Sequence, residues 1–366
     1  MTSHKQDYEG TEQPKRSLAQ VLHLISSPSV EKMSTDSVDV EERKRAFKFY
    51  KCFPDEPKQL ENLDTSLSAF VTTTTLTNSI NGFLEPSFVL QHNLTEEFFL
   101  LRSAIPETAF LPFYEEALFD WPFASYARNN LSESKIDSGF WSKSLLEFSN
   151  PSGTNQLLGR LRWVTLGYHY DWEKKIYPPG CQSQFPTKCG DFFKSIALTI
   201  SEVIGYRRDL LTQKSYYDNF IPEASIVNYY RKKTTMGFHI DDSEACKRAP
   251  LVSISLGRPC IFLLEASTCI PGHLPHGNIG NTAKTIIPIL LQHGDIMVTG
   301  GHSRLAYHAV PRLLSWRNAS QCLSHDFFPS LLSAFKKRFG EDGIRENLEK
   351  YVLTTRLNVN VRQVNE

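Results

Sequence analysis

RLNVNVR, at residues 356–362, has the period of a β-strand whose two faces differ in chemistry. Side chains alternate along a strand, so one face is apolar and the other carries two arginines and two asparagines. Asparagine is a poor strand former, and strand propensity therefore does not explain the polar face. Arg356 and Arg362 would stand about 20 Å apart at the usual rise of a strand, and they could hold an anion. The alternative is the solvated face of an edge strand.

Composition limits the classes of protein to consider. Forty basic residues balance 40 acidic ones, so any nucleic-acid site has to be a local basic face. The seven cysteines include no C-x-x-C pair, which argues against a disulfide framework and a zinc ribbon and suits a reducing compartment. No apolar run is long enough for a membrane span, and no signal or transit peptide is recognisable. We expect an intracellular protein of the nucleus, the cytoplasm or both, with the mitochondrion as an alternative.

The chain divides into four segments by composition and pattern. Residues 1–42 are polar and predict a disordered tail, and residues 43–80 predict a docking helix and a linker. Residues 81–215 predict an N-terminal helical region, with mixed helix and loop over the aromatic-rich part up to residue 150. Its clearest helix runs from Asp191, a candidate N-cap, to Tyr206.

Residues 216–366 form the fourth segment, in which short strands replace the helical period. Turn residues separate candidate strands at 225–230, 237–241, 251–256, 260–265, 295–299, 307–310 and 356–364. This pattern predicts an α+β protein whose core is a β-sandwich or jelly-roll barrel. No glycine-rich nucleotide-binding motif follows a strand, so a nucleotide-cofactor fold has no support.

A metal site is the first chemical hypothesis. Strand alternation puts His239 and Asp241 on one face, and a histidine from another strand would complete the facial triad of non-haem Fe(II) oxygenases. A second H-x-D, His293–Asp295, competes with it. His308 lies several strands beyond Asp241 but only a hairpin beyond Asp295, and Gly294 marks the second motif as a turn. We therefore predict His239, Asp241 and His308 as ligands.

Two alternatives to this triad stay open. His302 is a lesser rival for the third position. The whole motif could also be a core histidine beside a capping aspartate.

The open coordination positions of such a triad require a co-substrate. 2-Oxoglutarate would chelate iron through its keto acid, and its far carboxylate would pair with an arginine. Arg356 supplies that chemistry. Asn228 and Tyr230 share one strand face ahead of the H-x-D and could bond the same carboxylates.

These pieces, in this order, resemble the AlkB family of Fe(II)/2-oxoglutarate-dependent dioxygenases. The resemblance is carried by NYY at 228–230, HID at 239–241, SRLAYHAVPR at 303–312 and RLNVNVR at 356–362. LRWVTLGYHYDW at 161–172 narrows it to the eukaryotic AlkB homologue 1 subgroup. It implies a double-stranded β-helix (jelly-roll) core preceded by helices and a nucleotide-recognition lid.

The resemblance also implies roles for residues. His239, Asp241 and His308 match the iron ligands. The residues matching the 2-oxoglutarate site are Asn228, Tyr230, Arg356, Asn358 and Arg362. The residues matching the lid over the target nucleotide are Trp163, Tyr168, His169 and Tyr170. Interleaved aromatics beside arginines suit base stacking with phosphate contact, although a buried strand could present the same pattern.

The chain departs from the family pattern in three places. Ser243 stands where an acidic residue often follows the first ligand. A long loop is expected at 265–288, where His273 and His276 raise the weaker alternative of a second metal site. A second insertion, at 313–350, carries basic residues 336–338 on an expected helix, as a solvated face or a nucleic-acid contact.

The implied function is oxidative demethylation of N-methylated nucleobases in RNA or DNA, with Fe(II), 2-oxoglutarate and O₂. The partner would be nucleic acid, either tRNA or DNA. Three alternatives remain: oxygenation of protein side chains such as those of histones, lyase cleavage at abasic sites, and nucleic-acid binding without catalysis.

Overall fold

The computed structural model describes residues 35–68, 71–75, 88–92, 97–131, 160–205, 214–231, 233–268, 283–316, 319–340 and 345–366. Contacts divide the chain into Met1–Arg45 and Ala46–Glu366, and every candidate site residue belongs to the second unit. Among the described helices, none is both long and apolar enough to cross a membrane.

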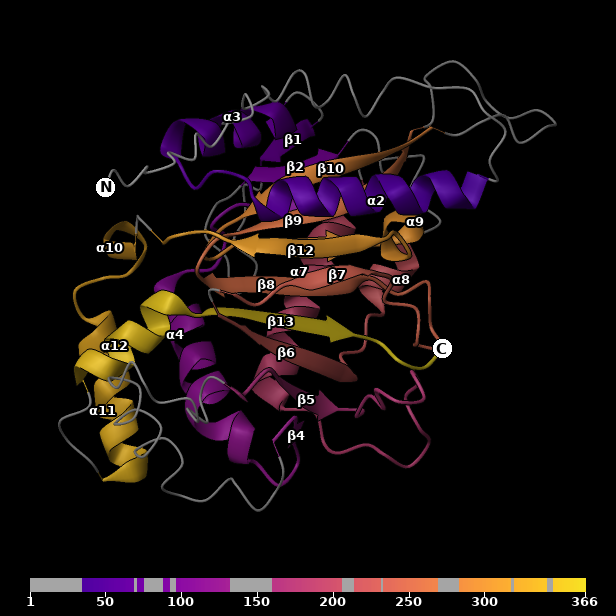
Figure 1. The fold of residues 1–366 in the computed structure, drawn as a ribbon. Helices are drawn as coiled ribbons and strands as arrows, with labels where there is room; N and C mark the ends of the chain where they lie inside the picture. Colours follow the sequence, from indigo (N-terminus) through magenta and orange to yellow (C-terminus); the bar gives the residue numbers. More distant parts are fainter. Residues whose placement is uncertain are drawn as a thin grey trace, which may run out of the picture. The chain divides into compact units, whose positions relative to one another are not determined.

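Two antiparallel sheets form the body of this second unit (Figure 1). The larger sheet has nine strands in the order β1-β2-β3-β11-β8-β13-β6-β5-β4. In chain order these are β1 (Val71–Thr75), β2 (Phe88–His92), β3 (Phe98–Leu101), β4 (Arg128–Asn129), β5 (Trp163–Gly167), β6 (Ala224–Tyr230), β8 (Leu251–Gly257), β11 (Ile296–Thr299) and β13 (Arg356–Arg362). The smaller sheet, in the order β10-β9-β12-β7, contains β7 (Met236–His239), β9 (Cys260–Thr268), β10 (Ala283–Leu291) and β12 (His308–Leu313).

Both faces of the larger sheet are covered. Phe99 and Leu101 of β3 belong to one apolar cluster, whereas Phe98 and Leu100 belong to a second cluster that includes residues of the smaller sheet. A strand buried on both faces reads as a continuous apolar run, which is why FFLL does not alternate in polarity. The second cluster therefore lies between the sheets.

The described helical segments are α2 (Thr35–Lys51), α3 (Pro57–Ser68), α4 (Glu107–Glu115), η2 (Glu116–Asp120), η3 (Trp121–Phe123), α7 (Thr187–Gly205), α8 (Lys214–Asp218), α9 (Gly301–Arg304), α10 (Ala319–Cys322), α11 (Phe327–Phe339) and α12 (Arg345–Thr354). Helices α4, α7, α11 and α12 supply buried residues to the first cluster, on the other face of the larger sheet, whereas α3 contacts β10 of the smaller sheet. The long helix α7 buries its predicted apolar stripe, including Phe193, Ile196 and Ile200. In Figure 1, α11 and α12 lie beside α4.

β13 is a central strand, paired with β6 on one side and β8 on the other. Its apolar residues Leu357, Val359 and Val361 join the helix-side cluster. Its arginines and asparagines consequently face the space between the sheets. The predicted alternation is confirmed, and the solvated edge strand is excluded.

Several expected boundaries were wrong. Helix α2 begins at Thr35, inside the expected tail, and α3 and β1 occupy most of the expected linker. Strands β2, β3 and β4 lie in the region expected to be helix and loop. Helix α7 begins at Thr187 rather than Asp191, because Pro186 provides the fixed φ and the absent N–H of a helix start.

The expected loop at 265–288 was also too long. β9 and β10 pair as a hairpin from Ala283↔Thr268 to Leu291↔Cys260, so both ends of that range are strand. His273 and His276 lie outside the described residues, as do residues 1–34.

Candidate metal centre

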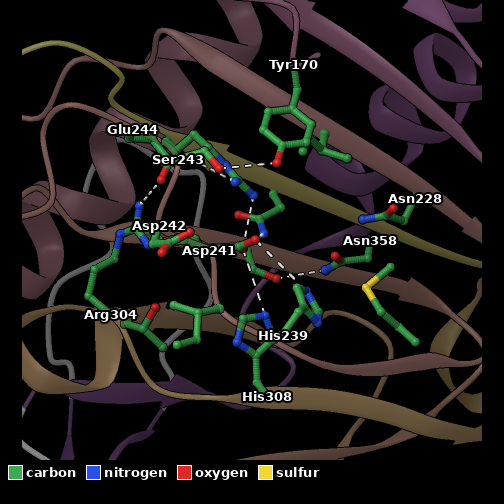
Figure 2. A pocket seen from close by; sticks show the side chains of 18 of the residues that line it. Tyr170, Asn228, His239, Asp241, Asp242, Ser243, Glu244, Arg304, His308 and Asn358 are labelled. Carbon is green, nitrogen blue, oxygen red and sulfur yellow. Dashed lines mark hydrogen bonds and ion pairs between the residues drawn. The ribbon is translucent and has the colours of Figure 1, made fainter. Parts of the chain in front are cut away.

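Three side chains predicted from sequence meet between the sheets (Figure 2). His239 ends β7 and His308 begins β12, and the antiparallel pairing sets these residues directly opposite each other. Their rings lie 4.2 Å apart between centroids. Asp241 follows two residues after His239, just beyond the strand end rather than within it. One ligand atom from each of the three residues lies within 4.8 Å of the others, the spacing of atoms that share one ion.

Backbone carbonyls fix the orientation of both imidazoles. Nδ1 of His239 lies 2.9 Å from the carbonyl oxygen of Gly237, and Nδ1 of His308 lies 3.1 Å from that of Ala306. A carbonyl only accepts, so each Nδ1 carries the proton and each Nε2 keeps its lone pair. Both Nε2 atoms point toward Asp241, at 4.0 and 3.9 Å from its carboxylate oxygens. This is the outer-sphere arrangement of metal-binding histidines.

The ionisation states also suit a cation. Burial, together with nearby His239, lowers the pKa of His308 to about 4, so the imidazole is neutral at pH 7. Burial raises the pKa of Asp241, but Arg362 and the two histidines outweigh burial and hold that pKa well below its usual range. Arg362 Nη2 lies 3.2 Å from Asp241 Oδ2. A neutral imidazole and an ionised carboxylate are the forms that bind metals.

The two rivals to this triad lie elsewhere. His302 is an exposed residue of α9 and is not part of the cluster. His293 and Asp295 form a turn in which Gly294 has a φ of 79°. Asp295 pairs with Arg102 at 2.7 Å, and His293 accepts a hydrogen bond from the Gly257 N–H. The second H-x-D is therefore structural, as its glycine indicated.

Arg356 is a buried cation beside this centre. Its side chain is 2% exposed and lines the same cavity as the triad. It donates to Ser255 Oγ at 2.8 Å, while its Nε has no hydrogen-bond partner. Within the described residues no carboxylate forms an ion pair with it. A buried guanidinium without a counter-ion is costly unless an anion binds there.

The predicted neighbours of Arg356 line the cavity too. Tyr230 lies directly opposite Arg356 in the β6–β13 register, and Asn228 lies opposite Asn358. Asn358 donates to Ser253 Oγ at 2.7 Å, which fixes its amide. The structure thus places all five residues predicted for 2-oxoglutarate on adjacent strands around one cavity of about 1450 Å³.

A buried ion-pair network supports the metal end. Glu244 Oε1 pairs with Arg362 at 2.8 Å, and Glu244 Oε2 pairs with Arg304 at 2.7 Å. Arg304 also donates to the Asp241 carbonyl oxygen. The carboxylate that the family pattern led us to seek at Ser243 is thus present one residue later. Ser243 instead lies 3.2 Å from the Tyr170 hydroxyl.

The predicted lid residues separate into two groups. Tyr170 lines the cavity, and Trp163 does not line it but packs against Trp172, which does, with 5.2 Å between the ring centroids. Tyr168 and His169 do not line it. His169 is buried, with its ring nitrogens 2.9 Å from Thr165 Oγ1 and 3.3 Å from Ser183 Oγ, and burial lowers its pKa to about 4. His169 thus holds its own segment in place through these two contacts, and its predicted contact with substrate stays a prediction.

Sequence reasoning missed four residues of the site. Asn360 lies on the polar face of β13 and its Nδ2 is 3.4 Å from Asp241 Oδ2, so strand alternation could have identified it. Arg304 stood within the quoted motif at 303–312 but was given no role, and its pairing with Glu244 joins segments 60 residues apart, which the sequence does not show. Trp172 stood within the quoted motif but was given no role.

Two histidines and one aspartate around a common point, beside a buried arginine, are typical of non-haem Fe(II) oxygenases. Comparison of the sequence with known protein families agrees with this class. The profile of the 2OG-Fe(II) oxygenase superfamily matches residues 122–362. The chain belongs to that superfamily.

Similar proteins of known name narrow the position of the chain within the superfamily. It is 36% identical over 214 residues to the mouse "Nucleic acid dioxygenase ALKBH1", covering 57% of this chain and 47% of that protein. It is 32% identical over 231 residues to "tRNA demethylase abh1" of Schizosaccharomyces pombe, covering 62% and 65%. The solved structure of OsALKBH1 aligns with a TM-score of 0.42 at 17% identity, covering 73% of this chain and 96% of that one. The chain spans about half the length of the mouse relative, and the AlkB homologue 1 resemblance is confirmed.

The cofactors of this superfamily are Fe(II), 2-oxoglutarate and O₂, as predicted. The residues present fit them. Two Nε2 lone pairs and one carboxylate face a common point, and the cavity beyond offers a buried arginine without a counter-ion. Five basic residues line the cavity, namely Arg304, Arg356, Arg362, Lys175 and Lys247, against three acidic ones, Asp241, Asp242 and Glu244. Two positive charges are in excess, which suits a dianionic co-substrate.

Proposed function

We propose that this chain is an Fe(II)- and 2-oxoglutarate-dependent demethylase of N-methylated nucleobases. The observation that carries the proposal is the convergence of His239, Asp241 and His308 beside Arg356 in one cavity. Bound iron, O₂ and 2-oxoglutarate supply the oxidation that removes a methyl group as formaldehyde, with succinate and CO₂ as co-products.

The side chains of this chain position the reactants. We propose that His239, Asp241 and His308 hold the metal and that the Arg356 fork pairs with the far carboxylate of 2-oxoglutarate. Asn228, Tyr230 and Asn358 bond the same molecule, and Arg362 lies nearer the metal. Glu244 holds Arg362 in position beside Asp241, because its two carboxylate oxygens pair with Arg362 and Arg304.

Nucleic acid is the substrate class that the comparisons favour. The two relatives described above are named for nucleic acid and tRNA, and an Arabidopsis relative, 29% identical over 209 residues, is named a DNA N(6)-methyladenine demethylase. We propose that the two sheets form the double-stranded β-helix of the family and that the segment carrying Trp163 and Tyr170 is its nucleotide-recognition lid. A base from a duplex or a folded RNA would have to be extruded from its helix to reach the metal centre.

Formaldehyde and succinate should be measured together across methylated tRNA, single-stranded RNA, DNA and histone peptides. We expect equimolar formaldehyde and succinate from at least one nucleic acid, and neither product when iron is omitted. Turnover confined to histone peptides would show an oxygenase of proteins. Iron-independent cleavage of abasic DNA, trapped by borohydride, would show a lyase. His239→Ala that demethylates as fast as wild type would sink the proposed mechanism.

A further inference from the structure

The segment after β5 folds back on itself as a closed loop at the cavity mouth. Tyr168 pairs with Gln182, and Asp171 pairs with Ile176 as isolated antiparallel bridges. Residues 172–175 are therefore a tight turn, with Trp172 at its start and Lys175 at its end. Both residues line the cavity that holds the metal triad.

Polar contacts make this turn rigid. Asp171 Oδ1 accepts the backbone N–H groups of Glu173 and Lys174, each at 3.0 Å, and the Lys175 N–H donates to the Asp171 carbonyl oxygen at 2.8 Å. Lys175 has a φ of 55°, a left-handed conformation that is strained for a residue with a side chain. Strain of this kind concentrates at functional sites.

Trp172 is an aromatic surface that its own chain only half covers. Its side chain is 43% exposed, although tryptophan is usually well buried. Tyr170 contacts it edge-on at 4.8 Å and Trp163 lies 5.2 Å away, so the indole is held from the protein side. Tyr170 itself continues inward to Ser243, beside the metal triad (Figure 2).

The two lysines of the turn differ in their contacts. Lys174 lies 3.8 Å from Asp171 Oδ2, so its charge is shared with its own loop. Lys175 forms no ion pair in the described part of the chain and lines the cavity. A free cation next to an open indole matches a nucleotide, which presents a phosphate beside a base.

We propose that Trp172 and Lys175 form a subsite for the nucleotide next to the target, with the neighbouring base stacked on the indole and its phosphate paired with the lysine. The substrate class is therefore a single-stranded or looped polynucleotide, because a stacked neighbour has to be unpaired. This subsite rests on the proposed function for the target base held further in.

Equilibrium binding under anaerobic conditions tests the subsite apart from catalysis. Fluorescence anisotropy would be recorded for a labelled single-stranded RNA carrying one N-methyladenosine, with Mn(II) and 2-oxoglutarate present. We expect Trp172→Leu to weaken binding about tenfold, and Trp172→Phe to recover most of the loss because it keeps a stacking ring. Competition by the free methylated nucleoside should be the same in all three proteins. Thermal unfolding would confirm that the variants are folded.

The lysines provide a matched pair of equal charge. Lys175→Gln should weaken binding and lower the slope of log Kd against log salt by about 0.7, the value for one phosphate contact on a single strand. Lys174→Gln should change neither quantity. Equal effects of the two substitutions would overturn the proposal.

Three other outcomes would also overturn the subsite. They are unchanged RNA affinity in Trp172→Leu, an equal loss for the free nucleoside, and Trp172-dependent binding of a histone peptide without binding of RNA. A wild-type chain that binds RNA in this manner but releases no formaldehyde would instead contradict the proposed function alone.

Discussion

The proposed pairing of Arg356 with 2-oxoglutarate can be tested by a single substitution. Its planar fork is buried, donates to Ser255 and has no carboxylate partner among the described residues. Lysine keeps the charge but loses the bidentate geometry, so Arg356→Lys should raise the KM for 2-oxoglutarate at least tenfold, about 1.4 kcal/mol. Succinate formation at varied 2-oxoglutarate measures it, with the exposed Arg160→Lys as control. An unchanged KM in Arg356→Lys would place the co-substrate elsewhere.

His293 makes a pH-dependent contribution to stability. Burial lowers its pKa from 6.5 to about 3, so the unfolded chain binds a proton there that the native chain does not. Stability supplied by the neutral imidazole is complete above pH 6.5 and is lost as the pH falls toward 3. The loss reaches about 1.4 kcal/mol per pH unit.

Replacing this histidine removes that dependence. The free energy of unfolding of His293→Gln should fall less steeply than that of wild type between pH 6.5 and 5, whatever its absolute value. Urea unfolding at several pH values measures both slopes. Parallel slopes would mean that His293 binds protons equally in the native and the unfolded chain, so that its pKa is not lowered by folding.

Residue types and their order predicted the metal triad, Arg356, Asn228 and Tyr230, because strand alternation and H-x-D spacing are local patterns, whereas the roles of Asn358 and Arg362 came from the family resemblance. The ion pair of Glu244 with Arg304 could not be predicted, since it depends on how distant segments meet. The sequence did not show that His169 packs against Thr165 and Ser183, because both contacts depend on how its segment folds back.

At the scale of elements, the end of β8 is fixed by Gly257. Its φ is +82°, and an added Cβ would lie 2.4 Å from the Thr355 carbonyl oxygen and 3.0 Å from the Tyr114 hydroxyl. Gly257 also pairs with Arg356 across the β8–β13 ladder. A side chain here has to push apart the strands that present the arginine.

Gly257→Ala should therefore lower the free energy of unfolding by about 3 kcal/mol or more. Gly340→Ala is the matched control, since Gly340 has a φ of +70° but nothing within 4 Å of the added Cβ, and it should cost only about 1 kcal/mol. Chemical denaturation compares the two. Equal losses of unfolding free energy in the two variants would show that the backbone around Gly257 moves aside at little cost.

Element boundaries were harder to predict than element types. β13 was predicted as a strand and its alternation was confirmed, because one of its faces is entirely apolar and the other entirely polar. β2, β3 and β4 were missed because the aromatic-rich region lacks period-2 alternation. β3 is buried on both faces and reads like a helix core.

For the whole molecule, the two-sheet arrangement explains how a chain without net charge can bind an anion. Positive charge is in local excess in the cavity between the sheets, where five basic side chains line the wall against the three acidic ones Asp241, Asp242 and Glu244. On the surface, Arg338 of α11 pairs with Asp120 at 2.7 Å. The basic run at 336–338 thus includes an arginine already engaged by its own chain.

The identity of the third metal ligand is the most direct test of the whole account. Calorimetric titration with Mn(II), a redox-inert substitute for Fe(II), should show one ion per chain in wild type when 2-oxoglutarate is present. His308→Ala should lose this binding, while His302→Ala, which alters an exposed histidine of α9, should retain it. Retention of the ion by His308→Ala together with its loss in His302→Ala would contradict the account.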